Sequence, residues 1–320
     1  RADCAKRVHV DDILRLGGTR VELGVQTIYD DVLKKVKRGN TNQDNIDATQ
    51  LIKDSFLKVC YHAMIGLPLT TRDMDIHAVK AYFTNADYMP DALKIYPCMV
   101  FKGTELYDAW KQGSYVPLTA EQAQDIIIEA KQYIPRFCRV MRIQRDIPTT
   151  MVDAGVERTN LRQMIHNVMK KKKLTCKCIR CREPHHKTID WDHVKLKRFD
   201  YDASGGKEIF LSYEDVKNDI LLGFNRLRIP SKSYRPEITE RSAGIREIHV
   251  YGPAVKVGDK NTDHVQHKGI GNLLMEEAEK IAQEDYDTKK MLVISGIGVR
   301  QWFKNKFNYK QDGPYVSKTF

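Results

Sequence analysis

The stretch that most constrains the fold runs from residue 245 to residue 282 and joins an apolar segment, a polar loop and a helical pattern. Residues 245–251 read IREIHVY, which is typical of a strand, and residues 266–271 read QHKGIG. Apolar residues then recur from position 273 to 282 at the spacing of one helix face. This order places free backbone N–H groups at a helix N-terminus, where a pyrophosphate can bind, and glycine lets the backbone approach it closely. A turn with a purely structural role fits the G-x-G spacing equally well.

The pattern after this helix repeats the alternation. A short strand is expected at residues 291–295, a helix from residue 299 and a final strand at residues 309–317. This strand–helix–strand–helix–strand order resembles the acyl-CoA-binding core of the GNAT acetyltransferases. The longer words are more specific: EIHVYG (247–252), QHKGIG (266–271), LLMEEA (273–278), VISG (293–296) and DGPY (312–315). They resemble the acetyltransferase domain of the catalytic subunits of Elongator, and the resemblance extends over nearly the whole chain.

Length and charge narrow the class of protein. The 320 residues have room for two domains, and 53 basic against 42 acidic residues give a net charge of +11, which favours a polyanionic partner. No apolar run reaches the roughly 18 residues that a membrane span needs. The N-terminus does not read as a signal peptide, and seven cysteines argue against a disulfide framework. We therefore expect a cytoplasmic protein that has no membrane partner.

The first half alternates between strands and helices. Strands are expected at 20–26, 59–66 and 92–97, and helices of about ten residues lie between them. Such alternation predicts a parallel sheet or a (β/α) barrel, in which chemistry occurs at the carboxyl ends of the strands. The residues to examine at these ends are Glu22, Gln26, His62, Lys94 and Tyr96.

The same segments are similar to the later strands of the radical S-adenosylmethionine barrel of the Elongator catalytic subunits. The words are RVELGVQT (20–27), HAMIGLP (62–68), LKIYP (93–97) and KGTELY (102–107). The resemblance implies that Glu22 and Gln26 lie near bound S-adenosylmethionine, and that Lys94 and Tyr96 face the cavity as catalytic residues. The alternative is structural: Glu22 is an ion-paired residue at a strand end, and Tyr96 is a core aromatic with a polar hydroxyl.

The cysteines of this half depart from the family pattern. Radical S-adenosylmethionine enzymes hold a 4Fe-4S cluster with three closely spaced cysteines, whereas Cys4, Cys60, Cys98 and Cys138 are far apart. The chain begins inside a word that the family reads as Arg-Pro-Asp-x-Cys. We therefore expect the cluster segment to lie upstream, and we expect the chain as given not to perform radical chemistry.

Basic residues gather between the two halves. Residues 136–148 read RFCRVMRIQRDIP, which indicates a strand with a basic face, and a helix expected at 160–173 ends in four lysines. Arginine forks could bind phosphates, or the residues could form a strip of ion pairs; the lysines could contact RNA or only complement the helix dipole. The resemblance favours RNA. The nucleic-acid candidates are Arg136, Arg139, Arg142, Arg145, Lys170, Lys171, Lys172 and Lys173.

A C-x-C-x-x-C word follows at Cys176, Cys178 and Cys181. Three thiols at this spacing can converge on one tetrahedral metal in a reduced compartment, so we expect a zinc ion that holds the linker together. The candidates for the fourth ligand are His166, His185, His186 and Cys4.

In the C-terminal part, the resemblance implies an acetyl-CoA site. Backbone groups of Glu247, Ile248, His249 and Val250 would pair with the pantetheine arm, and Gln266, His267, Lys268, Gly269, Ile270 and Gly271 would hold the pyrophosphate. Trp302 and Phe303 stand where the family usually has two tyrosines beside the thioester. Tyr315 is the catalytic candidate, although a structural role fits it as well. His249 is either a base or a packed strand residue.

These observations predict an α/β chain with three parts. They are the C-terminal part of a radical S-adenosylmethionine barrel (1–147), a zinc-binding linker (148–198) and a GNAT domain (199–320). The resemblance implies a tRNA acetyltransferase in which acetyl-CoA, with radical chemistry in the complete protein, modifies C5 of the wobble uridine. The partners expected are tRNA and other Elongator-type subunits or a second copy. The alternatives are a lysine acetyltransferase acting on proteins, and a form that binds tRNA and acetyl-CoA without turnover.

Overall fold

The computed structural model describes residues 1–145, 147–148, 151–185, 187–251 and 269–320. The chain forms two compact units, each assembled from several segments. The first unit comprises Arg1–Cys4, Glu22–Ala48 and Val59–Cys181, and the second comprises Ala5–Val21, Thr49–Lys58 and Arg182–Phe320.

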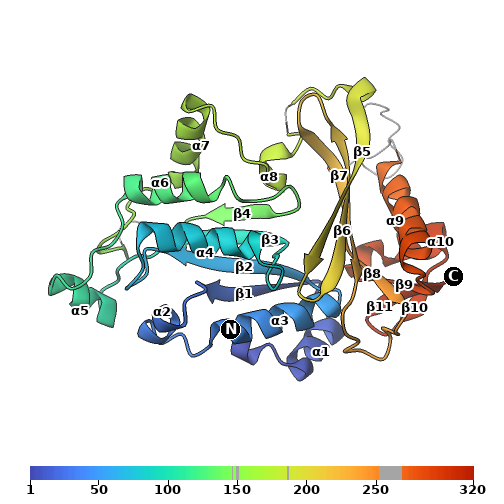
Figure 1. Cartoon of the computed structure of the whole chain (residues 1–320), viewed down its shortest axis with the longest axis horizontal. Coiled ribbons are helices and arrows are strands. Elements are labelled where there is room, and N and C mark those ends of the chain that lie inside the picture. The colour runs from blue at the N-terminus through green and yellow to red at the C-terminus, as the bar shows by residue number, and fades with distance from the viewer. Residues whose placement is uncertain (146, 149–150, 186, 252–268) are drawn as a thin grey trace. The chain divides into compact units, whose positions relative to one another are not determined.

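The first unit is built on a four-stranded sheet in the order β1-β2-β3-β4 (Figure 1). The strands are β1 (Arg20–Gln26), β2 (Lys58–Ile65), β3 (Ala92–Pro97) and β4 (Arg139–Ile143). The β2–β3 and β3–β4 pairs are parallel, as the alternation of strands and helices predicted. The register shifts between Leu93 and Lys94, so that Arg139 lies opposite Ala92 and Arg142 opposite Lys94. This irregularity places both arginines on one face despite their odd spacing.

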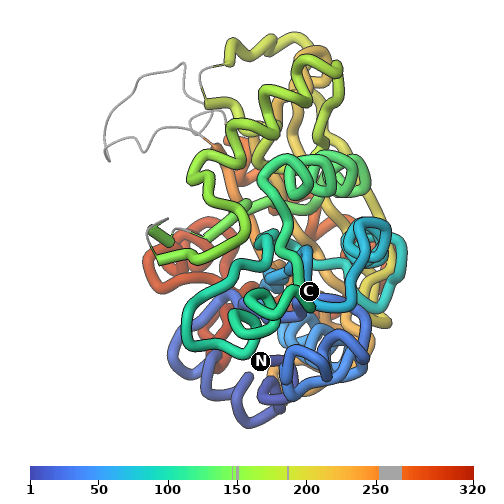
Figure 2. Tube along the Cα trace, turned by 90° about the vertical axis from the view of Figure 1, so that its left-hand side faces the viewer, coloured from blue at the N-terminus to red at the C-terminus, as the bar shows by residue number. Residues whose placement is uncertain are grey.

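Helices lie between these strands, and two more, α7 and α8, follow the last of them. They are α2 (Asp30–Lys35), α3 (Asn42–Asp54), α4 (Arg72–Thr84), α5 (Glu105–Lys111), α6 (Ala120–Ala130), α7 (Leu161–Lys171) and α8 (Ile179–Arg182). A short 3-10 turn, η1 (Ala2–Cys4), precedes them. Helix α6 packs against both α4 and α7 (Figures 1 and 2). It begins with a capping box in which Thr119 and Gln122 each satisfy a backbone N–H group of the other. Helix α7 confirms the helix that was predicted at residues 160–173.

The second unit is built on a seven-stranded sheet in the order β10-β11-β9-β8-β7-β6-β5. The strands are β5 (Val194–Ala203), β6 (Gly206–Asp215), β7 (Ile220–Ile229), β8 (Ser242–Val250), β9 (Lys290–Val293), β10 (Lys310–Asp312) and β11 (Tyr315–Thr319). Strands β5 to β8 form an antiparallel meander, and β8 pairs with β9 in parallel. The single strand predicted at 309–317 is wrong: Gly313, with φ +56°, turns the chain into the β10–β11 hairpin.

Helix α9 (Ile270–Tyr286) covers one face of this sheet. Leu274, Met275 and Ala278 on α9 pack against Leu222 and Ile245 in the main hydrophobic core. Helix α10 (Arg300–Phe307) follows the turn η5 (Ile297–Val299) and packs against β11. The unit also contains α1 (Arg7–Arg15) and the turn η3 (Trp191–His193).

A buried ionic network lies on the sheet of the second unit. Arg228 donates to Asp54 and, over 2.9 Å, to Glu208, while Arg246 donates to Glu208 over 2.9 Å. All four side chains are at most 1% exposed. Because buried charges are tolerated only when they are paired, this network ties the end of α3 to strands β6, β7 and β8.

The helices of the described residues give no membrane span, since none of them is both long and apolar enough to cross a bilayer. The polar composition of residues 230–243 predicts an exposed loop, but the segment is partly buried. Ile238 in it is 2% exposed, and Arg235 is ion-paired to Glu237 and Asp11. That expectation is wrong because the polar residues of this segment are used in ion pairs.

Candidate functional site

A cavity of about 780 Å³ opens in the second unit between the end of β8, the start of α9 and α10. Apolar and aromatic side chains, two glycines, one amide and one ammonium group surround it. The lining residues are Ile248, Val250, Gly269, Gly271, Asn272, Val299, Trp302, Phe303 and Lys306. A cavity of this size, mostly apolar with a few polar groups, is typical of a site for a cofactor.

The two glycines have different roles at this cavity. Gly269 is the N-cap of α9 and has φ +72°, a left-handed conformation that favours glycine. A Cβ atom on Gly271 would lie 3.7 Å from both Val250 and Trp302, so this glycine faces the cavity between those side chains. The first turn of a helix leaves N–H groups without intrahelical acceptors, and these groups favour an anion.

Strand β8 exposes a backbone edge at the same place. Its parallel pairing with β9 covers Ser242 to Ile245 and ends where the Ile294 N–H group donates to the Ile245 carbonyl. On its other side, β8 stays paired with β7 as far as Val250. Among the strands that the structure describes, the pairing of β8 with β9 thus stops at Ile245, beside the cavity, where an extended amide chain could bind.

The side chains of Glu247 and His249 on β8 do not line the cavity. Glu247 pairs with Arg226 over 2.9 Å and with Lys58 over 3.7 Å. His249 is exposed, and its ring centroid lies 4.5 Å from that of Tyr251. Of the predicted pantetheine segment, Ile248 and Val250 therefore line the cavity with their side chains.

The remaining predicted residues of this site lie at different places. Ile270 is buried in the core of the unit. Tyr315 does not line the cavity: it is fully buried, packs edge-on against Phe56 and donates its hydroxyl to the Ser55 carbonyl over 3.0 Å. Burial raises the pKa of Tyr315. Its catalytic role stays a prediction. Gln266, His267 and Lys268 lie outside the described residues.

A polar cluster lies on the sheet of the first unit. Glu22 on β1 accepts hydrogen bonds from His62 Nε2, over 2.7 Å, and from the ammonium group of Lys94. His62 and Lys94 are register partners on β2 and β3. Tyr96 meets His62 at right angles with 5.5 Å between ring centroids, and the guanidinium of Arg145 lies 5.9 Å from the Tyr96 centroid. The structure thus brings together four predicted site residues, Glu22, Lys94, Tyr96 and Arg145, with His62.

The pKa shifts of Glu22 and His62 indicate which of the two side chains donates the hydrogen bond between them. Burial acts to raise the pKa of Glu22, but hydrogen bonds from Lys94 and His62 outweigh it and leave that pKa below its ordinary value. Burial lowers the pKa of His62. Glu22 is therefore an ionised acceptor, and a neutral His62 donates its Nε2 proton to it. The Sγ atom of Cys60 lies within 4.8 Å of the donor atoms of Glu22 and His62, but the Glu22 oxygen that a metal would need already accepts two hydrogen bonds.

Gln26 ends β1 with φ 65°, a left-handed conformation that is uncommon outside glycine. Its side-chain nitrogen lies over Gly24, where a Cβ atom would be 2.7 Å from it. Arg38 donates to the Gly24 carbonyl over 3.1 Å. An outlier of this kind at the carboxyl end of a strand is common at ligand sites.

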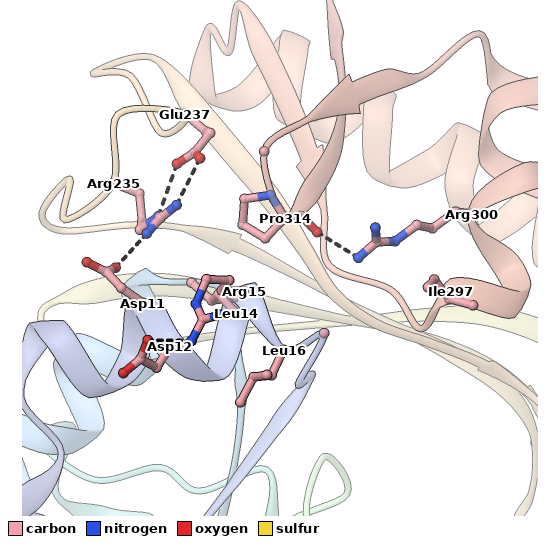
Figure 3. A pocket seen from close by; sticks show the side chains of 12 residues that line it. Asp11, Asp12, Leu14, Arg15, Leu16, Arg235, Glu237, Ile297, Arg300 and Pro314 are labelled. Carbon is pink, nitrogen blue, oxygen red and sulfur yellow. Dashed lines mark hydrogen bonds and ion pairs between the residues drawn. The ribbon is translucent and has the colours of Figure 1, made fainter.

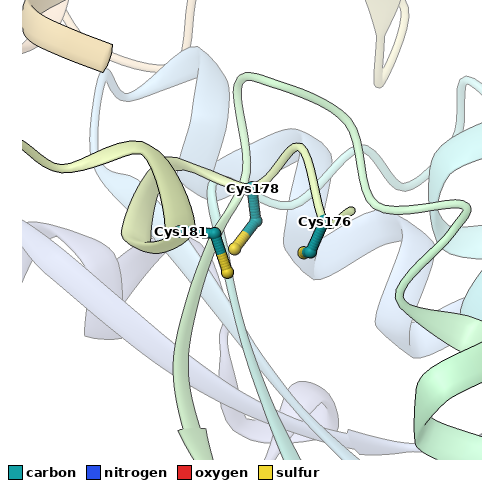
Figure 4. Close-up of side chains that lie close together, drawn as sticks. All are labelled: Cys176, Cys178 and Cys181. Atoms are coloured by element: carbon teal, nitrogen blue, oxygen red, sulfur yellow. The ribbon is translucent and has the colours of Figure 1, made fainter. Parts of the chain in front are cut away.

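The three cysteines of the C-x-C-x-x-C word converge, and their sulfur atoms all lie within 4.8 Å of one another (Figure 4). Lys131, which caps the C-terminus of α6, is fully buried and places its Nζ atom 3.9 Å from Cys181 Sγ. Hydrogen bonds from Cys176 and Cys181 lower the pKa of Cys178. Burial acts to lower the pKa of Lys131, but the nearby thiols raise it. The site therefore combines clustered thiols with one buried cation.

The metal-ligand candidates from elsewhere in the chain do not join these sulfurs. Among the residues that the structure describes, Cys4, His166 and His185 have no ligand atom in this group. His186 lies outside the described residues. The sequence offered no sign of Lys131, which lies 45 residues before Cys176 and reaches it through tertiary packing.

The predicted nucleic-acid residues lie in the first unit. Arg139 and Arg136 are half-buried, whereas Arg142 and Arg145 are exposed. Lys170 to Lys173 are all exposed at the end of α7. Arg142 lies next to Lys94 in the sheet register, so the arginine strip continues into the polar cluster around Glu22.

A second pocket, of about 570 Å³, lies within the second unit (Figure 3). Arg235 crosses it between Asp11, at 2.6 Å, and Glu237, at 2.9 Å. Arg300 donates to the Pro314 carbonyl over 3.0 Å. Of the three arginines that line this pocket, Arg235 is therefore paired with two carboxylates, and Arg15 is paired with Asp12.

Comparisons with known proteins give two matching family models and several similar curated proteins. A family model described as the Radical SAM superfamily matches residues 4–80, and one described as the Radical_SAM C-terminal domain matches residues 90–171. Among curated proteins, the tRNA uridine(34) acetyltransferase of Methanocaldococcus infernus is 50% identical over 99% of this chain and 61% of its own length. Elongator complex protein 3 of Saccharomyces cerevisiae is 44% identical over 99% of this chain and 58% of its own length.

Among solved structures, the Elp3 of Methanocaldococcus infernus with an N-terminal deletion (1-46) aligns with a TM-score of 0.94 and 49% identity. That alignment covers 100% of this chain and 76% of the solved chain. The chain spans about 60% of the length of the curated relatives it matches. Identity of this level over the whole chain, with the same fold, shows that the chain belongs to the family of Elongator complex protein 3.

Proposed function

We propose that this chain is the part of a tRNA-modifying acetyltransferase that binds acetyl-CoA and tRNA, acting on C5 of the wobble uridine in the complete protein. The observation that carries the proposal is the cavity between the end of β8 and the N-terminus of α9. The names of the archaeal relatives, tRNA uridine(34) acetyltransferase, support the same substrate.

The cavity fits the chemical parts of acetyl-CoA in order. Beyond its pairing with β9, the backbone of β8 would offer N–H and C=O groups to the two amides of a pantetheine arm. The N-terminus of α9 offers N–H groups to a pyrophosphate, and the ammonium group of Lys306 adds a positive charge to the same lining. Trp302 and Phe303 supply an apolar wall that excludes water from the thioester. Lys306 and Asn272 were not predicted from the sequence.

We further propose that the thiols of Cys176, Cys178 and Cys181 hold a structural zinc ion. Tetrahedral zinc with Zn–S bonds of about 2.3 Å separates its sulfurs by roughly 3.8 Å, which the observed grouping allows. Three thiolates and one zinc ion carry a net charge of −1, and the buried ammonium of Lys131 would balance that charge.

The cluster around Glu22 is the part of the first unit that we assign to S-adenosylmethionine in the complete protein. The model matches to the radical S-adenosylmethionine families support this assignment. When bound with a 4Fe-4S cluster, that cofactor supplies radical chemistry. Glu22 and Gln26 would contact it, while Lys94, held by Glu22, presents a fixed positive charge and Tyr96 a hydroxyl.

For tRNA we propose the half-buried Arg136 and Arg139, the exposed Arg142 and Arg145, and the lysines at the end of α7 as phosphate contacts. The complete protein would act in the cytoplasm with other Elongator-type subunits or as a homodimer. We also propose that this chain divides into a barrel part (1–147), a linker (148–198) and a GNAT domain (199–320).

The experiment is a pair of binding measurements on the chain, followed by one transfer assay. Isothermal titration with acetyl-CoA and fluorescence anisotropy with a labelled tRNA should each give specific binding. The variant Arg139→Ala/Arg142→Ala/Arg145→Ala should bind tRNA more weakly with a flatter salt dependence, yet bind acetyl-CoA normally. Acetyl transfer to a histone-tail peptide, with no response to tRNA, would instead support a lysine acetyltransferase.

A further inference from the structure

A row of lysines and aromatics on β5, exposed except for the half-buried Tyr201, has no part in the sites described above. The row consists of Lys195, Lys197, Phe199 and Tyr201, which we call the β5 strip. These residues are spaced by two, so the pleat of the strand presents them on one face. The intervening residues point to the other face: Leu196 packs on the core beneath α9, and Arg198 pairs with Asp285 of α9. The strip therefore lies on the face of the sheet opposite α9.

The face of the sheet that carries the β5 strip is positively charged at its surface. Lys195 and Lys197 are exposed and form no ion pair with any residue that the structure describes. Their cross-strand partners on β6 are Glu214 and Ser212, and Glu214 is 2% exposed and paired with Arg182 over 2.8 Å. The carboxylate of Glu214 is therefore already used, and the strip offers positive charge to solvent.

The aromatic part of the strip extends a row that runs across the sheet. Phe199 is 48% exposed and lies opposite Phe210, which stacks on Phe224 with 5.3 Å between ring centroids. Tyr201 lies beside Phe199, with 5.7 Å between the two rings. Phe210 and Phe224 are each 2% exposed, so Phe199 is the most exposed ring of the row. Its strand, β5, is the last strand of the sheet.

We propose that the β5 strip binds unpaired nucleotides of the RNA substrate, with Lys195 and Lys197 on phosphates and a base stacked on Phe199. The inference rests on the proposed RNA-modifying function and adds a contact surface in the second unit. Exposed aromatics interleaved with lysines are the surface that single-stranded nucleic acid binds, because every base has a face that can stack. A second copy of this chain, with the same basic strip, would meet like charge there.

The test measures binding of a labelled tRNA anticodon stem–loop and of a blunt RNA duplex to the full chain over a series of salt concentrations. Phe199→Ala should weaken binding of the stem–loop by about 5- to 150-fold, the range for one lost stacking contact, and leave the duplex unaffected. Phe199→Tyr should restore binding. Lys195→Ala/Lys197→Ala should reduce the steepness of the salt dependence by about 1.4, since each phosphate contact on a single strand contributes about 0.7.

Arg198→Ala is the matched control, because it removes a cation from the same strand on the opposite face, where Asp200 and Asp285 already pair with it. It should bind RNA like the wild type. Melting temperatures of all variants should stay close to that of the wild type, since the substituted residues are exposed. If the wild type binds no RNA, the proposed function fails together with the strip.

If the wild type binds the stem–loop and the Phe199 and lysine variants bind it equally well, the strip alone is refuted. Sedimentation velocity tests whether the strip instead mediates self-association. A dimer that dissociates on Phe199→Ala, with RNA affinity unchanged, would assign the strip to self-association and overturn the proposal.

Discussion

The substitution Gly271→Glu is the sharpest perturbation of the cavity beside α9. A Cβ atom at this position would lie 3.7 Å from Val250 and from Trp302, which is ordinary van der Waals contact. The backbone therefore tolerates a side chain here, and the rest of the glutamate would extend into the cavity. We expect the variant to fold normally and to lose acetyl-CoA binding.

The size of the loss follows from charge as well as volume. A carboxylate about 5 Å from one pyrophosphate charge, at an effective dielectric constant of about 20, costs roughly 3 kcal/mol. That repulsion alone corresponds to a loss of about 100-fold in affinity. Displacement of the ligand by the side chain adds to it. Isothermal titration with CoA measures the result, and tRNA affinity, measured by anisotropy, should stay within about threefold of the wild type.

Two further variants distinguish the effect of filling the cavity from the effect of straining the backbone. Gly271→Ala adds only the Cβ atom and should retain CoA binding. Gly269→Ala meets no atom within 4 Å, but it must adopt φ +72°, which costs about 1–2 kcal/mol of stability. It should lower the melting temperature and still bind CoA when folded. CoA binding at wild-type affinity by Gly271→Glu, or an equal loss in Gly271→Ala, would refute this account of the cavity.

Three further predictions concern zinc affinity and stability. Lys131→Met should lower zinc affinity, measured by competition with a chelator, by about 10- to 100-fold, because the compensating cation is lost; unchanged affinity would contradict the role of Lys131. Gly244→Ala should destabilise the fold by about 1–3 kcal/mol in urea, since its Cβ would lie 2.4 Å from the ring of Phe56; a neutral effect would show that the ring can move. Burial raises the pKa of Asp75 to about 6, so the free energy of unfolding should fall by about 3 kcal/mol as the pH rises from about 4 to 6. The melting temperature of Asp75→Asn should not fall over this pH range. A pH profile identical to that of the wild type would contradict the assignment.

The sequence predicted elements well where periodicity was strong and local. Strand β3 was expected at residues 92–97 and lies there, and the helix after Gly271 is α9. Strand β5 was missed because it is an edge strand with lysines on one face and charged residues on the other, which hides the alternation of apolar and polar residues. The β10–β11 hairpin was read as one strand because its turn depends on a single glycine conformation.

The candidate sites were predictable where they depend on local order and not where they depend on packing. Gly271, Val250 and Trp302 were expected together and line one cavity. Tyr315 was expected beside them, but its strand directs the hydroxyl to Ser55 in the core. Lys131 reaches the cysteines through the packing of α6, which no spacing in the sequence records.

The measurement that tests the central claim most directly is acetyl-CoA hydrolysis by the chain, titrated with tRNA. Two transcripts should be compared that differ only at the wobble position, one with uridine and one with cytidine. The proposed function predicts that hydrolysis rises on addition of tRNA, more strongly with the uridine transcript, and that Gly271→Glu abolishes it. Hydrolysis that does not change with either transcript, while the chain acetylates a lysine peptide, would contradict it.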